Sequence, residues 1–346
     1  MYGIAVTKTQ AVAQAVTLDD LYPLLRLLAQ GEFRSGEVLA KELGITRAGI
    51  WKQIQLLNAV PGIAIESVHG KGYKLESGLQ VLDACRIHNR VPESIRSRLG
   101  GLKILVETDS TNDWLRDHTS ADLHTGQACI AEYQRAARGR RGRQWVCVFG
   151  SNIYLSLAWR FDLPMADLAG LSLAAGVNVA RVLTAHGLQA HGLKWPNDIY
   201  LKGRKLGGIL VEASGEMAGP SLAIIGVGIN VKLSGDSTQG IDQPWTDMAN
   251  HLETLPDRNQ LCGDLLAGLM DTCLTYQKQG LSPFLEDWKG YDIYLGQPVT
   301  LHMGNQVARG IYCGLDERGG LVLEQSDGCR SWYAGEVSLR GGETDE

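Results

Sequence analysis

The spacing of apolar residues changes twice along this 346-residue chain, and each change marks a region that must fold in a different way. Residues 18–79 show short helical spacings and then a hairpin pattern, whereas residues 80–290 mix strand patterns with long helices. Residues 291–346 alternate apolar and polar positions between glycines, which is typical of short antiparallel strands. The chain is also too long for one ordinary domain. We therefore expect three folded regions, preceded by a loose tail over residues 1–17.

The first region has the pattern of a winged helix-turn-helix. The apolar positions expected to face its core are Leu21, Leu24, Leu25 and Leu28, then Val38, Leu39 and Leu43, then Ile50, Ile54 and Leu57. Ser35 and Thr46 precede the second and third helices as capping residues, and Gly44 follows the second helix. Residues 63–68 and 73–75 flank a glycine turn and predict a two-stranded wing. This layout is typical of DNA-binding domains.

Local charge favours a nucleic-acid face on this region. Residues 18–79 hold seven Lys/Arg and seven Asp/Glu, but from Arg47 to Leu75 four basic residues accompany one acidic residue. The expected DNA-binding residues are Arg47, Trp51, Lys52, Gln53, Lys71 and Lys74, with Ala48, Gly49 and Gln55 also exposed. Trp51 is unusual on such a face, and packing in the core is its alternative. A degenerate module that no longer binds DNA is the alternative for the whole region.

Composition excludes several classes of protein. The formal net charge of −5 gives no global basic field for nucleic acid. The seven cysteines are scattered without a Cys-x-x-Cys pair, which favours reduced thiols over a disulfide framework or a zinc site. No apolar run reaches the roughly 18 residues that a membrane-spanning helix needs. The first residues also lack the layout of a signal peptide. We therefore expect a cytoplasmic protein with no membrane segment.

The middle region is predicted to belong to the α/β (α+β) class. The expected strands cover residues 104–107, 128–133, 153–159, 199–201, 205–212 and 223–231, and the expected long helices cover residues 168–186 and 261–279. Interleaved strands and helices indicate a sheet covered by helices. Short alternating segments over residues 295–340 then predict a small C-terminal β-barrel.

The strongest chemical signal is an arginine loop, residues 135–143, which holds five arginines and two glycines. Guanidinium groups bind carboxylates and phosphates with paired hydrogen bonds, and glycines let the backbone approach a ligand closely. Repulsion among the like charges predicts a loop that stays open until an anion binds. A solvated basic loop or a nucleic-acid patch is the alternative.

Three further strings carry weaker signals. Residues 110–112 (Ser-Thr-Asn) follow a predicted strand, so they either cap the next helix or bind a small polar ligand. Lys194 precedes a proline-fixed segment, where a held lysine would stabilise charge on phosphorus; a surface lysine beside a turn is the alternative. Residues 226–230 hold a lone Gly-x-Gly, which is weak support for a nucleotide site.

Taken together, these strings resemble the biotin–protein ligase family. The resemblance rests on residues 131–134 (Ala-Glu-Tyr-Gln), 138–143 (Arg-Gly-Arg-Arg-Gly-Arg), 194–198 (Lys-Trp-Pro-Asn-Asp) and 228–230 (Gly-Ile-Asn). The helix-turn-helix and the wing at residues 70–73 resemble the bifunctional subclass, which is also the biotin operon repressor. The resemblance covers about residues 18–340. It implies an SH3-like C-terminal barrel, and an enzyme that makes biotinyl-AMP from biotin and ATP.

The resemblance implies roles for the matching residues. Biotin would contact Ser110, Thr111, Asn112, Gln134, Arg138, Gly139, Arg140, Arg141, Gly142 and Lys194. ATP or the adenylate would contact Arg140, Trp145, Asn197, Asn230, Trp245 and Arg340. The catalytic residues would be Lys194, Arg138 and Arg140: the arginines would hold the biotin carboxylate and the adenylate phosphate, and Lys194 would stabilise the adenylation transition state. The loop at residues 232–247 would fold over the adenine. Mg²⁺ would bridge the ATP phosphates, without a protein metal site.

The resemblance also implies partners. Biotin would pass to a lysine of the biotin carboxyl carrier protein of a carboxylase, and the winged helix would bind biotin operator DNA. Because four positive charges per protomer give modest DNA affinity, tight operator binding requires a dimer. The liganded form would be a homodimer formed by edge-strand pairing of the central sheets, with biotinyl-AMP as both product and corepressor.

One position departs from the family pattern. The loop usually begins with glycine, but here Ala137 stands in its place. If that site requires a positive φ, alanine costs on the order of 1 kcal/mol and the loop follows a different path. A lipoate-type acyl ligase and a purely regulatory biotin-sensing protein are the alternative functions.

Overall fold

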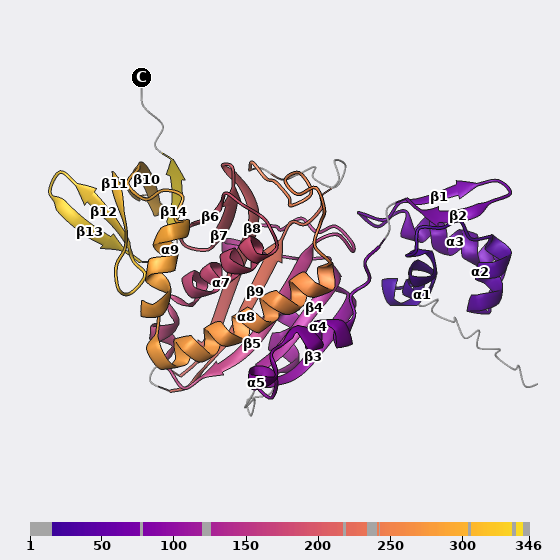
Figure 1. Ribbon diagram of the computed structural model, residues 1–346, viewed down its shortest axis with the longest axis horizontal. Helices are drawn as coiled ribbons and strands as arrows, with labels where there is room; N and C mark the ends of the chain where they lie inside the picture. The colour runs from indigo at the N-terminus through magenta and orange to yellow at the C-terminus, as the bar shows by residue number, and fades with distance from the viewer. Residues whose placement is uncertain are drawn as a thin grey trace, which may run out of the picture. The chain divides into compact units, whose positions relative to one another are not determined.

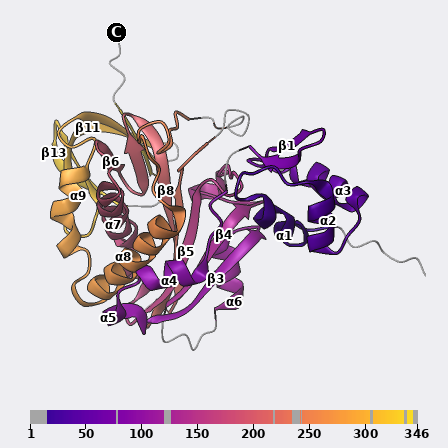
Figure 2. The same cartoon turned by 45° about the vertical axis from the view of Figure 1, so that its right-hand side comes forward.

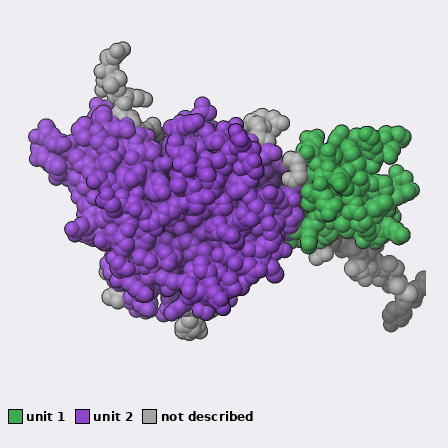
Figure 3. Space-filling view, in the orientation of Figure 1, with its two compact units in different colours: residues 1–59, 64–78 green, residues 60–63, 79–346 purple. Residues whose placement is uncertain are grey.

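The computed structural model describes residues 16–76, 79–119, 126–216, 219–233, 241, 243–303, 306–333 and 337–341, the last range for its backbone alone. Most of the expected N-terminal tail therefore lies outside the described residues. The chain divides into two compact units (Figure 3), one of residues 1–59 and 64–78 and the other of residues 60–63 and 79–346. The expected boundary at residue 290 stays a prediction, because both sides of it belong to the larger unit.

The smaller unit contains the predicted helix-turn-helix and wing. Its elements are α1 (Leu18–Leu28), α2 (Gly36–Leu43), α3 (Arg47–Leu57), β1 (Ile65–Val68) and β2 (Gly72–Leu75), with the two strands antiparallel. Ser35 and Thr46 cap α2 and α3 through their side chains, and Gly44 ends α2 with φ of 65°. One expected core position is wrong: Val38 is 45% exposed, because Leu39 lies on the face of α2 that packs inward.

The larger unit is built on a mixed sheet, so the expected α/β class is confirmed. Its strands are β3 (Leu99–Thr108), β4 (Gly126–Gln134), β5 (Ile153–Phe161), β6 (His191–Lys194), β7 (Asp198–Leu201), β8 (Arg204–Gly215) and β9 (Ser221–Ile229). They form a seven-stranded sheet with the order β3-β4-β5-β9-β8-β7-β6 (Figure 1). Only β3 and β4 are parallel neighbours within it.

Helices of very different length accompany this sheet (Figure 2). They are α4 (Ala84–Arg90), α5 (Glu93–Arg96), α6 (Thr111–His118), α7 (Leu171–Ala185), α8 (Arg258–Gln279) and α9 (Leu285–Tyr291). The long helices α7 and α8 match the expected segments. The sequence did not predict α4, α5, α9 or β6, because segments of four to seven residues are too short to show a period.

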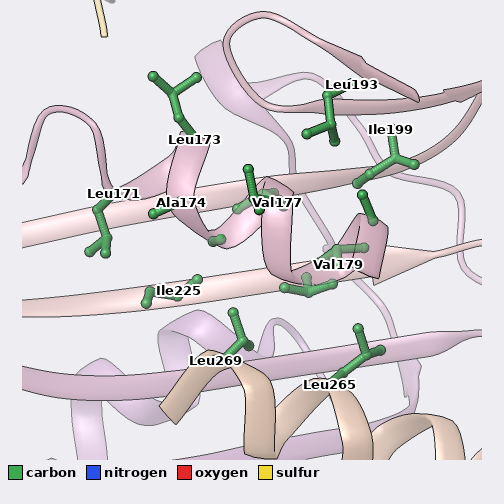
Figure 4. Close-up of a cluster of buried hydrophobic side chains, with 14 of the residues drawn as sticks. Leu171, Leu173, Ala174, Val177, Val179, Leu193, Ile199, Ile225, Leu265 and Leu269 are labelled. Carbon is green, nitrogen blue, oxygen red and sulfur yellow. The ribbon is translucent and has the colours of Figure 1, made fainter. Parts of the chain in front are cut away.

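The two faces of the sheet have different roles, because alternate residues of a strand point to opposite sides. Leu155 and Ile225 belong to the large core cluster that includes α7 and α8 (Figure 4). Their neighbours Ala158 and Ile224 pack instead with Leu115 of α6. Helices α7 and α8 therefore cover one face, and α6 lies on the other.

Helix α7 lies at the centre of the core. The segment Met165–Ala185 is long and apolar enough to cross a membrane by length and composition, with a mean hydropathy of 1.5. The expectation that no run reaches this length is therefore wrong. However, 72% of the segment's apolar window is buried inside the structure, which assigns it to the core.

The C-terminal region is all-β, as expected. Strands β10 (Pro298–Met303), β11 (Gln306–Leu315), β12 (Leu321–Gln325), β13 (Gly328–Trp332) and β14 (Val337–Gly341) form a five-stranded antiparallel sheet in the order β13-β12-β11-β10-β14. The Tyr312 hydroxyl donates to Asp292 at 2.5 Å, and the indole N–H of buried Trp195 donates to the Gly319 carbonyl at 3.0 Å. The C-terminal sheet therefore fixes the segment that follows Lys194.

Candidate active site

A pocket lies where α6, the arginine loop and strands β4, β8 and β9 meet. It has about 510 Å³ of space between atoms, open solvent at its mouth included. The predicted residues that line it are Ser110, Thr111, Asn112, Gln134, Arg138, Gly139, Trp145 and Asn197. The predicted residues Arg140, Arg141, Gly142, Lys194, Asn230 and Trp245 are not among its lining residues. Eight of the predicted residues therefore meet at one pocket, and the contacts expected of them stay predictions.

A buried hydrogen-bond network forms the floor of the pocket. The Gln134 side-chain oxygen accepts from the Thr111 backbone N–H at 2.8 Å and from its hydroxyl at 3.2 Å. The Ser156 hydroxyl lies 2.7 Å from the Thr111 hydroxyl and 2.6 Å from the Asn112 side-chain oxygen. The Asn112 amide N–H donates to Glu212 at 2.7 Å. These groups are held in fixed orientations, as recognition of a small polar ring requires.

Residues 110–112 cap α6 and also line the pocket, so the expected contact with a small polar ligand stays a prediction. The Ser110 side chain caps α6 by accepting from the Asp113 backbone N–H. Thr111 and Asn112, in the first turn of α6, are buried and line the pocket. The Ser110 cap therefore orients the first turn of α6 toward the pocket.

Two glycines of β9 make room for the floor. A β-carbon at Gly226 would lie 2.5 Å from the Asn112 side-chain oxygen, and one at Gly228 would lie 3.2 Å from the Trp145 ring. The Gly-x-Gly string gave weak support for a nucleotide site, but here it has a packing role. Because these positions carry no side chain, Asn112 and Trp145 can lie close to β9.

We expect Gly226→Ala to raise the KM for the pocket's ligand about tenfold, because an added methyl in a packed site costs about 1–3 kcal/mol. Asn112 cannot move away cheaply, since Ser156 and Glu212 both hold it. Steady-state kinetics against ligand concentration measure the effect. The matched control is Gly101→Ala on β3, where a β-carbon meets nothing within 4 Å. Equal KM values for the two variants would contradict the assigned role.

The arginine loop is a folded hairpin in this structure, and its expected opening in the absence of an anion stays a prediction. Its stem is closed by bonds from Gly139 N–H to the Arg143 carbonyl at 2.8 Å and from Trp145 N–H to the Ala137 carbonyl at 3.0 Å. Ala137 is not among the described non-glycine residues with positive φ, and it packs with buried Tyr154. Alanine therefore brings no strain at this position. The left-handed residues of the loop are Arg141, with φ of 59°, and Gly142, with φ of 70°.

Arg138 is surrounded by carboxylates. Its guanidinium makes a two-point ion pair with Asp113 and a further ion pair with Glu212 at 3.0 Å. The Asp113 hydrogen bond raises the pKa of Arg138, and Arg138 in turn lowers the pKa of Asp113. This residue was expected to hold a substrate anion, but here its hydrogen bonds go to the protein.

Arg140 differs from Arg138 in its electrostatics. Burial lowers the pKa of Arg140, with Arg141 acting in the same direction and Asp198 opposing both. A partly buried cation at a loop tip interacts strongly with an arriving anion, because less water screens it. Arg140 stays a candidate for binding a phosphate or carboxylate.

Lys194 ends β6 and is half-buried. Its ammonium lies 3.3 Å from the Tyr200 hydroxyl and 4.9 Å from the centre of the Tyr200 ring. The Lys194 ammonium is therefore held against a tyrosine rather than fully solvated. A second lysine, Lys205, pairs with Asp198 at 2.8 Å and lies 5.6 Å from the centre of the Trp145 ring. These two lysines bring positive charge to the β7–β8 side of the pocket.

The structure gives other predicted nucleotide contacts a structural role as well. The Asn197 amide donates to the Ile209 carbonyl at 2.7 Å, and the buried Asn230 amide donates to the Thr246 carbonyl at 3.1 Å. Trp245 is half-buried and pairs by its backbone with Lys205. Residues 234–240 and 242 of the expected adenine loop lie outside the described residues. Arg340 pairs with Thr300 through its backbone, and its side chain is not described.

The smaller unit presents the expected DNA face in part. Trp51 is 57% exposed on α3, so its alternative of core packing is wrong. Arg47 and Lys52 are exposed, although Arg47 lies 3.6 Å from Glu37. Gln53 is a correction: it is half-buried and its side-chain oxygen is shielded from solvent.

The wing carries its two lysines beside one aromatic ring. The ammonium groups of Lys71 and Lys74 lie 5.7 and 5.6 Å from the centre of the Phe33 ring. Both charges, one in the turn and one on β2, therefore lie near the same ring.

One cysteine lies beside the pocket: the Cys147 thiol accepts from the Gln134 amide at 3.8 Å. All seven cysteines are free thiols, and burial raises the pKa of Cys147 to about 11. Within the part of the chain that the structure describes, no group of three His, Cys, Asp or Glu side chains could hold a metal ion.

Comparison with known proteins gives the same division of the chain. Residues 105–230 match the Biotin/lipoate A/B protein ligase family, residues 294–340 match the Biotin protein ligase C terminal domain, and residues 21–74 match an HTH domain. The Bifunctional ligase/repressor BirA of Salmonella typhimurium is 42% identical over 320 residues, which are 92% of this chain and 97% of that protein. The chain belongs to the biotin protein ligase family. The sequence-based resemblance is thereby confirmed.

Other members of the biotin protein ligase family agree with this assignment. The Biotin--[acetyl-CoA-carboxylase] ligase of Mycobacterium tuberculosis is 34% identical over 232 residues, covering 64% of this chain and 83% of that protein. A biotin protein ligase of Aquifex aeolicus, solved in complex with biotin and ATP, has a TM-score of 0.60 and 27% identity over 70% of this chain and all of that chain. The larger unit therefore has a biotin protein ligase fold.

Sequence reasoning missed several residues of the site. Ser156 and Glu212 hold the floor, and Lys205 lies against the Trp145 ring. A signal was present for two of them: Ser156 and Glu212 are polar residues inside otherwise apolar strand segments. A buried polar residue on a strand requires a hydrogen-bond partner, so both positions indicate a network.

Proposed function

We propose that this chain is an ATP-dependent biotin protein ligase, which makes biotinyl-AMP and transfers biotin to a lysine of a biotin carboxyl carrier protein. The pocket carries the proposal: a floor of fixed amide and hydroxyl groups lies beside a loop rich in cations. Biotin combines a polar ring with a carboxylate tail. The floor suits its ring, and the cations suit its tail and the phosphates of ATP.

The roles of individual residues follow from these positions. Ser110, Thr111, Asn112 and Gln134 would hold the biotin ring. Arg140 would hold the carboxylate and the α-phosphate, with Arg141, Gly142 and Gly139 shaping the loop around them. Asn197, Asn230, Trp145, Trp245 and Arg340 remain candidates for the ATP side. Asn197 and Asn230 would act there through the backbone that their amides hold in place.

Adenylation joins two anions, so positive charge must concentrate where they meet. A carboxylate oxygen of biotin attacks the α-phosphorus, a new O–P bond forms, and pyrophosphate leaves with the electrons of the broken bond. Lys194 would stabilise the charge that grows on the phosphorus oxygens. Its ammonium is held over the Tyr200 ring rather than moving freely in solvent, so little reorganisation is needed during the reaction.

Magnesium would enter as part of the ATP complex and neutralise phosphate charge. The nearby carboxylate Asp198 is already paired with Lys205. The phosphates and water would therefore supply most of the ligands.

Transfer of biotin needs no enzyme nucleophile. The carrier lysine attacks the acyl carbon, AMP leaves, and the lysine loses a proton. The adenylate hydrolyses in water, so the loop and Trp145 would exclude solvent between the two steps.

The test of the ligase proposal is transfer of labelled biotin to an apo carrier domain in the presence of ATP and magnesium. We expect labelling of a single carrier lysine, together with pyrophosphate release that depends on biotin and not on lipoate. Release with lipoate would favour the acyl-ligase alternative. Biotin binding without labelling would favour a purely regulatory protein.

We propose that the smaller unit binds operator DNA and makes the protein a biotinyl-AMP-dependent repressor. Helix α3 presents Arg47, Trp51 and Lys52 to solvent, and the wing carries Lys71 and Lys74. Cations at these positions suit phosphates, and an exposed indole suits base edges in the major groove. The liganded protein would act as a cytoplasmic homodimer.

We expect Trp51→Ala to weaken binding to a specific duplex about tenfold, because one good base contact is worth about 1–3 kcal/mol. The duplex is selected from a random pool with the wild-type protein and biotinyl-AMP, and binding is measured by fluorescence anisotropy. Val38→Ala, at an exposed apolar residue of α2, is the matched control. The assigned contact is wrong if both variants bind as the wild type does.

A further inference from the structure

Four charged side chains beside the pocket form a compact cluster, which we call the Arg138 cluster: Asp113 and Arg116 from α6, Arg138 from the arginine loop and Glu212 from β8. Arg116 lies 2.6 Å from Asp113 and 3.3 Å from Glu212. Arg138 contacts both carboxylates, at 2.7 Å for its second bond to Asp113 and 3.0 Å for Glu212. Two cations and two anions balance, so the cluster has no charge left for a ligand.

Arg138 occupies the stem of the loop. Its backbone forms a bridge with Gln144, next to the bond between Gly139 N–H and the Arg143 carbonyl. The residues of the loop tip, Arg140 to Arg143, have no part in the cluster. Fixing the Arg138 side chain therefore fixes the stem, and the tip extends from a held base.

A substrate anion would have to displace two carboxylates to reach Arg138. Both carboxylates would also repel it at short range. Substrate binding at Arg138 is thus opposed by the arrangement that orients its side chain. The side chain is only 28% exposed, which limits its freedom to turn toward solvent.

Glu212 connects the loop to the floor of the pocket. The oxygen of Glu212 that contacts Arg116 also accepts from the Asn112 amide at 2.7 Å. Asn112 in turn is bonded to Ser156. One carboxylate therefore orders both the residues expected to hold the biotin ring and the stem of the loop expected to cover the adenylate.

We propose that Asp113 and Glu212 are positioning residues that anchor the arginine loop through Arg138, and that the anchored loop retains the adenylate. Arg138 acts in this scheme through its protein partners and not as a substrate ligand. The second half of the proposal rests on the proposed ligase function; the anchoring itself does not.

The test compares Asp113→Asn with Asp109→Asn in the full-length protein. Asp109 pairs with Arg135 at 2.9 Å on the exposed side of the same junction, outside the Arg138 cluster, so it is a matched control. Limited trypsin digestion with mass spectrometry measures cleavage after Arg140, Arg141 and Arg143. Escape of adenylate is measured by trapping it with hydroxylamine during turnover. Urea denaturation monitors global stability.

We expect Asp113→Asn to speed loop cleavage about tenfold and to raise adenylate escape by a similar factor, as local opening becomes easier. The KM for biotin should change less than about threefold, since the anchor does not touch biotin. Asp113→Glu should restore protection, because it restores the charge.

Two results would overturn the proposal. One is unchanged cleavage in Asp113→Asn; the other is a large rise in the KM for biotin with cleavage unchanged, which would mean that the cluster contacts substrate. If the wild-type protein makes no adenylate at all, the ligase proposal fails, but the digestion still decides whether Arg138 anchors the loop.

Discussion

Replacing Lys194 by alanine should lower the rate of biotin adenylation by about 10²–10³-fold, the range seen when one fixed donor to a transition state is removed. The side chain is held in place on both sides. Its ammonium lies 3.3 Å from the Tyr200 hydroxyl, and the next residue, Trp195, is 1% exposed and bonded to Gly319. When the Lys194 ammonium is removed, no neighbouring cation can take its position unless the site rearranges.

The loss should appear in the first half-reaction alone. Lys194 does not line the pocket, so biotin affinity measured by calorimetry should change little. Transfer from chemically supplied biotinyl-AMP to the carrier should also remain close to the wild-type rate. Lys103→Ala, an exposed lysine on β3, is the control and should be fully active. A Lys194→Ala variant with normal pyrophosphate release would remove this lysine from the mechanism.

Replacing Arg258 by methionine should cost about 3–5 kcal/mol of unfolding free energy, because it leaves a buried carboxylate without its partner. Glu132 is 0% exposed, and Arg258 is 4% exposed and lies 2.9 Å from it. Arg258 also donates to the carbonyls of Gln80 at 2.8 Å and Asn152 at 3.0 Å. These bonds join the start of α8 to β4, the strand that ends at Gln134 in the pocket.

Urea denaturation measures this effect, with Arg86→Met as the matched control. Arg86 pairs with Asp257 at 2.8 Å, but its side chain is 55% exposed, so its loss should cost no more than about 1 kcal/mol. The double variant Glu132→Gln with Arg258→Met should be less destabilised than Arg258→Met alone, because no buried charge remains unpaired. Equal losses for Arg258→Met and Arg86→Met would show that the buried pair has no special importance.

The residues behind these two effects, Lys194 and Arg258, differ in how well their importance can be predicted from the sequence. Lys194 stands in a short string that resembles a known family, so its importance can be predicted from the sequence alone. Glu132 stands in a similar string, but Arg258 is 126 residues away along the chain and carries no local signal. A buried ion pair of this kind becomes visible only when the chain is folded.

The helix-turn-helix shows the same contrast on a smaller scale. Its caps and its glycine are local features, and the structure has them where the sequence predicts them. The exposure of Val38 and the partial burial of Gln53 were not predicted, because the width of a buried helix face depends on what packs against it.

In the arginine loop, the tertiary structure decides which partners the arginines of the motif have. Charge composition left an anion-binding loop and a solvated or nucleic-acid-binding loop as alternatives, whereas in the structure Arg138 pairs with Asp113 and Glu212. Repulsion between the arginines predicted an open loop, but carboxylates from α6 and β8 offset that repulsion. Ala137 would add strain only at a positive φ, which it does not adopt.

By itself, the sequence determined the order of the longer elements, the α/β class, the helix-turn-helix and the strings that place the chain in its family. These depend on spacings of two to four residues or on short motifs, which a linear reading preserves. The tertiary structure alone decided which groups meet in the pocket. The bond from Asn112 to Glu212 spans 100 residues, and that from Thr111 to Ser156 spans 45. Such contacts depend on how strands are ordered in the sheet, and strand order is set by packing over the whole chain rather than by any local pattern.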